Sequence, residues 1–347
     1  MTLQSSGTIR WSDIRNEFGA NVGSTGVSLG RYRNSDSNFS NKNVGTLTDL
    51  PLDTGVPKSG TISASSFYSK KLNIIVDFHS GGTETRVSAS NQYAANNVQV
   101  VGGYIGRPSS ASGKRVIVHV NKTIGSETGG NDRCALRTGG WHPNTYSVEL
   151  EIGSSGKIYG AGGDGGDGGS AGNGSGQNGQ AGSSAIGWET MGNSTIKKIN
   201  NLGRIQAGYG GGGGGSGRQE YRRSGKKGGR WVGSTGGGGG GGAGVPSSTG
   251  GDSPTNAFGG GSNGSDGGNG TDVNSGNGGG GGASAGAGGD CGAVNNSSTK
   301  GSNGAAGGPP GGTGGNNGYA IMTSHSSLPT YTGNAVIGRT ITNSNPQ

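Results

Sequence analysis

One glycine-rich block constrains this chain more than any other feature of its sequence. The 160 residues from Tyr159 to Gly318 contain 63 of the 86 glycines, while the other 187 residues contain 23. Glycine makes up about 7% of an average protein. The block holds six aromatic residues. An ordinary hydrophobic core is therefore excluded for it, because such a core is built from large apolar side chains.

The glycines follow a three-residue period in part of the block. Residues 162–170 read Gly-Gly-Asp-Gly-Gly-Asp-Gly-Gly-Ser, and Gly176, Gly179 and Gly182 continue the same spacing. Unbroken runs follow at Gly210–Gly215, Gly236–Gly242 and Gly278–Gly282. Ordinary side chains lie between the runs, which predicts loops between repeated glycine segments.

Several structures have such a period. Collagen requires glycine at every third position and abundant proline, but the phase of this block breaks often and its prolines are few. Calcium-binding nonapeptide repeats require an apolar residue after the aspartate, which Asp164 and Asp167 lack. A flexible glycine-serine linker is the plainest alternative.

The interpretation that we favour is a bundle of left-handed helices of the polyproline-II type. Such helices have three residues per turn and no internal hydrogen bonds, so each N–H and C=O must find a partner outside its own helix. Without side chains, neighbouring helices approach closely enough to supply those partners. The predicted interior of the block is then backbone, and the intervening segments form loops at the helix ends.

The rest of the chain has a more ordinary composition. Residues 72–155 contain β-branched segments at 72–78, 98–101, 116–120 and 148–152. The last of these alternates apolar and polar residues, as a half-buried strand does. We predict a small antiparallel β domain here, so the fold class is mostly β and irregular with little α-helix.

The first 71 residues carry a short internal repeat. Ser-Gly-Thr-Ile occurs at 6–9 and again at 59–62, and each copy precedes a segment that resembles one helical turn. Ser12 is a suitable N-cap, and Gly19 a suitable helix end. With few apolar residues, this segment is expected to form a small module that needs a partner surface.

Signatures of catalysis and of metal binding are weak. The two cysteines lie 157 residues apart, and the four histidines show no metal-binding spacing. Matches to glycine-rich phosphate loops carry no weight inside a glycine block. The net charge of +8 permits contact with anionic surfaces. We expect no enzymatic activity, cofactor or metal, no nucleic-acid partner, and no membrane insertion.

The apolar segments around the glycine runs occur in a distinctive order. They are Ile158–Gly163, Ser184–Ile186, Ile199–Ile205 and Gly318–Ile321. Over residues 156–322 this order resembles the glycine-rich distal tail-fibre adhesins of T-even-type bacteriophages. The resemblance implies a sandwich of polyglycine-II helices whose tip loops bind receptors on the host surface.

The N-terminal repeat resembles a module at the start of virion structural proteins of T-even-type phages of marine bacteria, especially cyanophages. This departs from the attachment domain of the adhesin family. The two resemblances imply a virion-attachment module (1–71) and a polyglycine-II domain with tip loops (156–322). The β domain predicted from the strand pattern (72–155) lies between them, and a C-terminal tail (323–347) follows. The apolar residues expected to serve attachment are Ile9, Trp11, Ile14, Phe18, Ile62, Phe67 and Tyr68.

The most charged segment lies between two glycine runs. Residues 218–231 contain six basic residues, one acid and two aromatics. Arginine pairs with phosphate or carboxylate, and aromatic rings stack on sugars, so this predicted tip loop is a candidate receptor contact. A solvated loop is the alternative. The receptor-binding candidates are Arg218, Tyr221, Arg222, Arg223, Lys226, Lys227, Arg230 and Trp231, with Trp188 and Phe258 from two other segments, 183–195 and 245–258. For these last two aromatics the alternative is that they cap the ends of the packed glycine segments.

We therefore expect a receptor-binding protein of a phage tail fibre or tail tip, made in the host cytoplasm and carried on the virion. Its partners would be other tail or fibre proteins and a host glycan or outer-membrane protein. A virion structural component without a receptor role is the alternative. Two assemblies fit the sequence: a homotrimer, and a monomer that caps a trimeric fibre.

Overall fold

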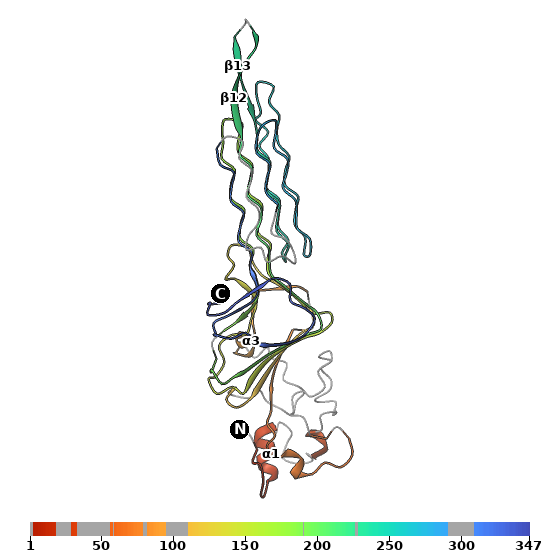
Figure 1. Ribbon diagram of the computed structural model, residues 1–347. Coiled ribbons are helices and arrows are strands. Elements are labelled where there is room, and N and C mark those ends of the chain that lie inside the picture. Colours follow the sequence, from red (N-terminus) through yellow and green to blue (C-terminus); the bar gives the residue numbers. More distant parts are fainter. Residues whose placement is uncertain are drawn as a thin grey trace.

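The computed structural model describes residues 3–18, 29–32, 56–57, 59–78, 82–94, 110–189, 191–225, 228–290 and 309–347. Within these residues the helices are α1 (Trp11–Phe18), α3 (Ala89–Ala94) and the 3-10 segments η1 (Leu29–Tyr32) and η2 (Ala64–Phe67). The prediction of a mostly β and irregular fold with little helix is confirmed. Figure 1 shows an elongated molecule with α1 at one end, β sheets in the middle and long glycine-rich chains at the other end.

Three sheets of parallel strands form the middle of the molecule. The first consists of β1 (Ile74–Phe78), β4 (Arg115–Val120), β7 (Ser147–Ile152), β10 (Ile196–Asn201) and β15 (Thr330–Gly333). The second consists of β2 (Glu84–Thr85), β5 (Thr123–Gly125), β8 (Lys157–Tyr159) and β11 (Arg204–Gln206). The third consists of β3 (Val87–Ser88), β6 (Cys134–Arg137), β9 (Ser184–Trp188), β14 (Tyr319–Thr323) and β16 (Arg339–Ile341).

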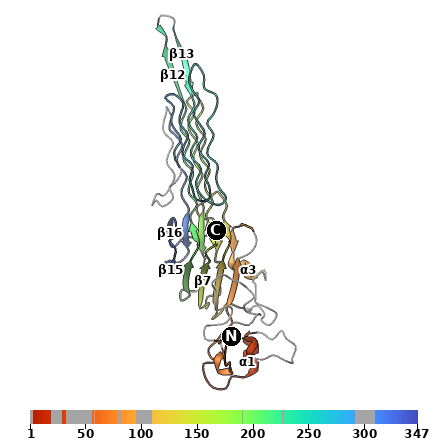
Figure 2. The ribbon, with the colours of Figure 1, turned by 90° about the vertical axis from the view of Figure 1, so that its right-hand side faces the viewer.

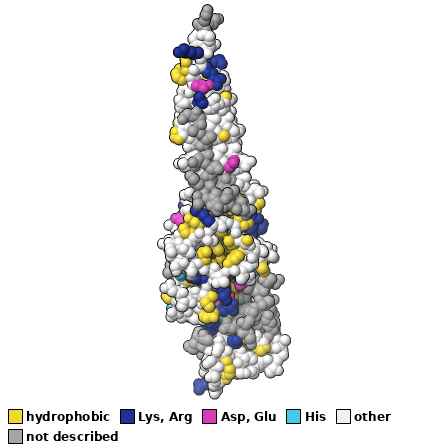
Figure 3. All heavy atoms as spheres, viewed as in Figure 1, with side chains coloured by type: hydrophobic (Ala, Val, Ile, Leu, Met, Phe, Trp, Pro, Cys, Tyr) yellow, Lys and Arg dark blue, Asp and Glu magenta, His cyan; other side chains and the backbone are white. Residues whose placement is uncertain are grey.

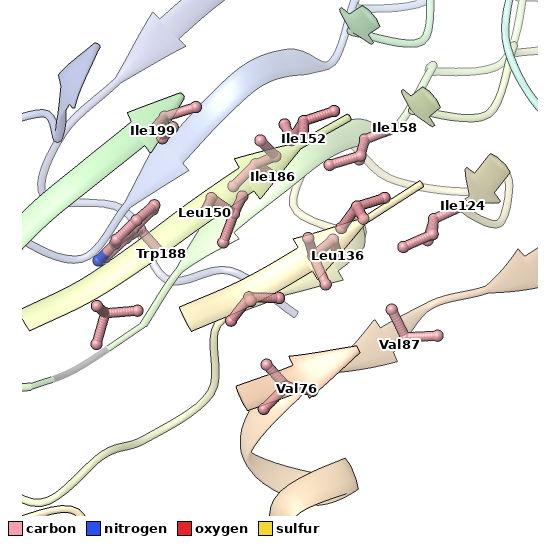
Figure 4. Packing of buried hydrophobic residues seen from close by; sticks show 14 of the residues in the cluster. Val76, Val87, Ile124, Leu136, Leu150, Ile152, Ile158, Ile186, Trp188 and Ile199 are labelled. Atoms are coloured by element: carbon pink, nitrogen blue, oxygen red, sulfur yellow. The ribbon is translucent and has the colours of Figure 1, made fainter. Parts of the chain in front are cut away.

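The chain visits the three sheets in rotation, so β1, β2 and β3 make one coil and β4, β5 and β6 make the next. The coils enclose a triangular outline in Figure 1, and Figure 2 shows their strands side by side. Equivalent apolar residues stack from coil to coil, as Val76, Val118, Leu150 and Ile199 do in the first sheet. Figure 4 shows Val76, Leu150 and Ile199 among the side chains of one shared core, to which Val118 also belongs. This architecture is a parallel β-helix.

The predicted direction of the strands is wrong. The segments predicted as strands at 72–78, 116–120 and 148–152 do contain β1, β4 and β7, but β1 pairs with β4, and β4 with β7, in parallel. Alternation reveals which face of a strand is buried and carries no information about the direction of its neighbour. The predicted strand at 98–101 lies outside the described residues.

The glycine-rich chains are two insertions into the β-helix. Residues 160–183 leave after β8 and return at β9, and residues 207–318 leave after β11 and return at β14. Strands of the same three sheets therefore lie on both sides of residue 155, where we expected the β domain to end. Each insertion begins and ends at a strand of the β-helix. Its first and last residues therefore lie close to neighbouring strands, and the glycine-rich chains leave the β-helix side by side.

Backbone hydrogen bonds join the glycine-rich chains with a repeat of three residues. In the run Gly236–Gly242, successive N–H groups point in turn at three neighbouring chains. N–H groups of Gly236, Gly239 and Gly242 donate to carbonyl oxygens of Gly169, Gly166 and Gly163, with N to O distances of 2.9, 2.8 and 2.9 Å. Those of Gly237 and Gly240 donate to Gly286 and Gly289, both at 3.0 Å. Those of Gly238 and Gly241 donate to Ser265 and Gly268 at 3.1 and 2.9 Å. Its carbonyl groups accept hydrogen bonds from further chains, as those of Gly240 and Gly238 do from N–H of Gly212 and Gly279, at 2.8 and 2.7 Å respectively. The run is therefore enclosed by other chains.

Close packing explains why glycine fills these runs. A Cβ atom added at Gly239 would lie 2.0 Å from the carbonyl oxygen of Gly212, and one at Gly166 would lie 2.1 Å from that of Gln177. Both obstacles are backbone atoms, which no side-chain rotation can move. Any residue with a Cβ would force these chains apart and lengthen their hydrogen bonds.

The hydrogen-bonded array of glycine-rich chains forms a lattice, and short polar side chains supply hydrogen-bond acceptors at its edges. Oδ1 of Asp164 accepts hydrogen bonds from N–H and Oγ1 of Thr249 at 2.8 and 3.2 Å, and Oδ1 of Asp167 accepts from N–H of Asp252 at 2.9 Å. The same arrangement recurs at Asn178, Asn263, Asp266, Asn269 and Asp290. These side chains take the place of a missing neighbouring chain, because each supplies the acceptor that an outer N–H group needs.

Replacing Asp167 by alanine is expected to lower the free energy of unfolding by about 1 kcal/mol, the usual net value of one hydrogen bond. The reason is that N–H of Asp252 loses its acceptor. Denaturant titration of the two proteins measures the difference. Asp167→Asn keeps an oxygen acceptor and should lose less than half as much; equal losses for both variants would contradict this role.

Cys134 tests the packing of the β-helix core. It lies buried in β6, and burial raises the pKa of its thiol from 9.0 to about 12. The reactive thiolate is therefore scarce in the folded protein at pH 8. In a Cys291→Ser background, iodoacetamide at pH 8 should label Cys134 only after denaturation. The raised pKa of the Cys134 thiol in the folded protein has a second consequence. The free energy of unfolding, measured by urea titration, should fall as the pH rises from about 9 towards 12, because only the unfolded protein then loses the thiol proton.

The N-terminal module has a core of its own. It is formed by Leu3, Ile14, Phe18, Tyr32, Val56, Phe67 and Leu72. The module joins the β-helix through Glu17, whose carboxylate forms an ion pair with Nζ of Lys114 and accepts a 2.8 Å hydrogen bond from N–H of Leu72. Helix α1 starts at Trp11, so Ser12 is not its N-cap; Oδ2 of Asp13 accepts from N–H of Arg10 at 2.8 Å instead. None of the described helices is long and apolar enough to cross a membrane.

Candidate functional site

A β-hairpin projects from the end of the glycine-rich chains that lies farthest from α1 (Figure 1). Strand β12 (Arg218–Arg223) pairs antiparallel with β13 (Gly229–Ser234). Its turn contains Gly225 and Gly228 with φ of 56° and 88°, values that glycine adopts at little cost. The base is anchored, since Val232 is buried and N–H of Gln219 donates to Oδ1 of Asn173 at 2.6 Å.

Side chains on a strand alternate between its two faces, which gives this hairpin an aromatic face. Tyr221 lies directly opposite Trp231, and their rings meet edge to face with centroids 5.3 Å apart. Tyr221 is 50% exposed and Trp231 is 55% exposed. Large exposed aromatics side by side are unusual on a protein that acts alone.

Phe258 extends this face from another part of the chain. It forms an antiparallel bridge with Gly233 and lies 39% exposed. A Cβ atom added at Gly233 would lie 2.4 Å from Cε1 of Phe258, and one at Gly229 would lie 2.5 Å from Cε1 of Tyr221. The two glycines of β13 therefore provide the space in which the rings lie. Three aromatic rings therefore follow one another along β13: the ring of Tyr221 lies over Gly229, that of Trp231 comes next, and that of Phe258 lies over Gly233.

The opposite face of the hairpin is charged. Arg218, Glu220 and Arg222 lie on it, and Arg230 lies across from Arg222. One carboxylate serves two guanidinium groups, because Glu220 pairs with Arg218 at 3.4 Å and also with Arg222. Figure 3 shows hydrophobic, basic and acidic side chains gathered at this end of the molecule.

Arg223 differs from the other arginines of β12. By alternation it lies on the face of Tyr221, at the end nearest the turn. It is exposed and forms no ion pair with any described residue. The guanidinium group of Arg223 on the aromatic face is therefore available to bind an anionic ligand.

The structure brings together most of the predicted receptor-binding residues. Six of them lie on the hairpin: Arg218, Tyr221, Arg222, Arg223, Arg230 and Trp231. Phe258 joins them, whereas Lys226 and Lys227 lie outside the described residues. Gly229 and Gly233 were not among the predicted site residues, since nothing in a glycine-rich sequence distinguishes a glycine that makes room for a ring.

The inclusion of Trp188 was wrong. Its side chain has no exposed surface and lies in the β-helix core with Ile186 and Leu150 (Figure 4). Trp188 was expected in a segment between glycine runs at 183–195, but Ser184–Trp188 forms strand β9, which is buried along its length. A buried ring offers no contact to a receptor.

The residues predicted for virion attachment divide into two groups. Ile14, Phe18 and Phe67 are buried in the core of the N-terminal module, so the expectation that their side chains contact a partner is wrong. Ile9, Trp11 and Ile62 pack against that core and stay partly exposed, and the hydroxyl of Tyr68 donates to the carbonyl of Gly7. The buried residues shape the module, while the partly exposed ones remain candidates for contact.

The rest of the described chain offers no comparable site. No group of three or more His, Cys, Asp or Glu residues within it could hold a metal ion. A shallow hollow of about 280 Å³ lies beside the C-terminus, lined by Arg137, Gly140, Glu189, Asn345, Pro346 and Gln347. In it Nε of Arg137 lies 3.4 Å from Oε1 of Glu189, so the two charges neutralise each other.

No protein-family model matches the chain, and no curated protein matches it. Among solved structures the chain is similar to one described as the crystal structure of the gp37-gp38 adhesin tip complex of the bacteriophage S16 long tail fiber. The two share 20% sequence identity with a TM-score of 0.35, over 82% of this chain and 88% of that one.

Proposed function

We propose that this protein is a receptor-binding adhesin of a phage tail fibre or tail tip. The observation that carries the proposal is the exposed aromatic and basic hairpin at the end of the molecule opposite the N-terminal module (Figure 1). A protein that binds by one end presents its contact residues there. The resemblance of residues 156–322 to glycine-rich adhesins supports the same function.

We also propose that the glycine-rich chains form a polyglycine-II sandwich. The three-residue repeat of hydrogen bonds around Gly236–Gly242 supports this architecture, since a helix with three residues per turn directs every third N–H to the same neighbour. Such a sandwich is a stiff support that places the hairpin far from the β-helix. In this proposal its partners are other tail or fibre proteins, bound through the N-terminal module, and a glycan or protein of the host surface.

Removing the tip of the hairpin tests the receptor role. Residues 221–231 are replaced by Asn-Gly, which suits a two-residue hairpin turn, and Glu220 and Val232 keep their pairing. We expect the fluorescently labelled variant to lose binding to the bacteria in a panel of Gram-negative and cyanobacterial isolates that the natural chain binds. Thermal denaturation should show that the fold is retained.

The alternative is a structural component of the virion without a receptor role. Antibody labelling of purified phage particles that encode the chain, together with a test of the protein's binding to their host cells, separates the two functions. Protein present on particles that binds none of their host cells would overturn the adhesin proposal. If the variant with the shortened hairpin binds cells as well as the natural chain does, the hairpin is not the receptor contact.

A further inference from the structure

We propose that the aromatic face of the hairpin binds an acidic polysaccharide, with sugar rings against Tyr221, Trp231 and Phe258 and an anionic group at Arg223. This inference rests on the proposed function and specifies its ligand. It also divides the hairpin by face: the aromatic face makes the contact, and the face of Arg218, Glu220 and Arg222 does not.

The arrangement of the rings supports a sugar chain. The three aromatics occupy successive positions of one face above residues 229, 231 and 233. Alternate residues of a strand lie about 7 Å apart, so the row extends about 14 Å along the hairpin. Aromatic faces carry negative potential, which attracts the weakly positive C–H groups on the flat side of a pyranose ring.

The charge on this face selects an acidic sugar over a neutral one. Arg223 is exposed on the side of Tyr221 and pairs with no described residue. A guanidinium fork binds carboxylate or phosphate through two parallel hydrogen bonds. By contrast, Arg218 and Arg222 already share the carboxylate of Glu220, so a second anion would compete with an existing ion pair. Arg230 is exposed and in no ion pair with a described residue, but it lies on the face opposite the rings.

The size of the face argues against a folded protein as the occupant. A six-residue strand is about 20 Å long, and two strands about 5 Å apart give a face of roughly 200 Å² once side chains are included. A stable protein interface buries about 800 Å² on each partner. A single-stranded nucleic acid requires a basic groove that follows its backbone, and this face presents one available arginine among the described residues.

Four soluble polymers separate the contributions of rings and charge in a binding assay with the full chain. Polygalacturonate has sugar rings and carboxylates, dextran has rings alone, polyacrylate has carboxylates alone, and oligodeoxythymidine has phosphates and bases. We expect polygalacturonate to bind most tightly. Equal or tighter binding of polyacrylate would show that the rings are not used, and tighter binding of the oligonucleotide would identify a nucleic-acid site; either result overturns the inference.

Matched variants test the two faces. Arg223→Gln should weaken polygalacturonate binding at least about tenfold, as expected when a charge-assisted pair of hydrogen bonds is lost, and Trp231→Ala should weaken it about tenfold or more. Arg222→Gln, one residue away on the other face, should change the affinity less than twofold. Similar losses for Arg222→Gln and Arg223→Gln would overturn the assignment to one face. All three side chains are exposed, so folding should not be affected.

Cell binding separates failure of this inference from failure of the proposed function. If the shortened hairpin loses cell binding while Arg223→Gln binds cells as Arg222→Gln does, the adhesin role stands and the acidic-sugar contact is wrong. If the natural chain binds no cells in the panel, the adhesin role fails. The polymer and variant results then still decide whether the aromatic face binds an acidic polysaccharide.

Discussion

Replacing Gly239 by alanine is expected to destabilise the folded protein by about 3 kcal/mol or more, the upper part of the range for overpacked sites. The added Cβ would lie 2.0 Å from the oxygen and 2.5 Å from the carbon of the Gly212 carbonyl group. Both atoms belong to a backbone that is itself bonded to other chains. Relief of the contact must therefore move a whole chain and weaken several hydrogen bonds at once.

Gly280→Ala is the matched control, because it makes the same change in another glycine run. A Cβ atom there would find only Oγ of Ser265 within contact range, at 3.7 Å. Alanine also reduces the entropy of the unfolded chain, so this variant should be unchanged or more stable by up to about 1 kcal/mol. Urea denaturation of both variants measures the contrast, and equal destabilisation would mean that close packing does not explain the glycines.

The composition of the glycine block already indicates where its interior must come from. A segment with almost no side chains can satisfy its N–H and C=O groups only by bonding to other backbone, and the three-residue period indicates how those bonds repeat. The order of the chains is different, since one glycine run resembles another. The neighbours of Gly236–Gly242 depend on loop lengths and on edge residues such as Asp164 and Asp167.

The β-helix was harder to predict for a physical reason. Its coils are interrupted by two long insertions, so strands that lie in one sheet, such as β9 and β14, are separated by more than one hundred residues. Local patterns identify strands and cannot pair them across that distance. Trp188 was misassigned for the same reason: it lies between glycine runs in the sequence and in the core of the fold.

The composition of residues 218–231 predicted the position of the candidate site in the sequence. It did not predict that these residues form a hairpin with an aromatic face. Arginine, tyrosine and tryptophan between two glycine runs indicated a contact loop. The alternation of Gln219, Tyr221 and Arg223 against Gly229, Trp231 and Gly233 contains the hairpin register, and a search for paired alternating segments could have found it. The approach of Phe258 to Gly233 depends on the lattice below and leaves no trace in the local sequence.

The second large effect is expected at the ion pair between the N-terminal module and the β-helix. The side chains of Glu17 and Lys114 are 2% and 5% exposed. Glu17→Ala leaves the ammonium group of Lys114 buried without this carboxylate, a change that typically costs about 3 to 5 kcal/mol. The loss should fall on the module, whose core is separate from that of the β-helix.

Hydrogen exchange locates the effect. A loss of about 3 kcal/mol in local stability corresponds to roughly a hundredfold faster exchange. The amide of Phe18 in α1 should therefore exchange about that much faster in Glu17→Ala, while the amide of Val118 in β4 should keep its protection. Equal acceleration at both positions would show that the ion pair supports the whole fold and is not specific to the module.

The double variant Glu17→Met/Lys114→Met distinguishes an unpaired charge from lost packing. It removes both charges and keeps side chains of similar length, so no ion is left buried alone. N–H of Leu72 still loses the acceptor that Glu17 supplies at 2.8 Å, which should cost about 1 kcal/mol. The double variant should thus recover more than half of the stability lost in Glu17→Ala. No recovery would mean that the carboxylate stabilises the module through contacts other than Lys114.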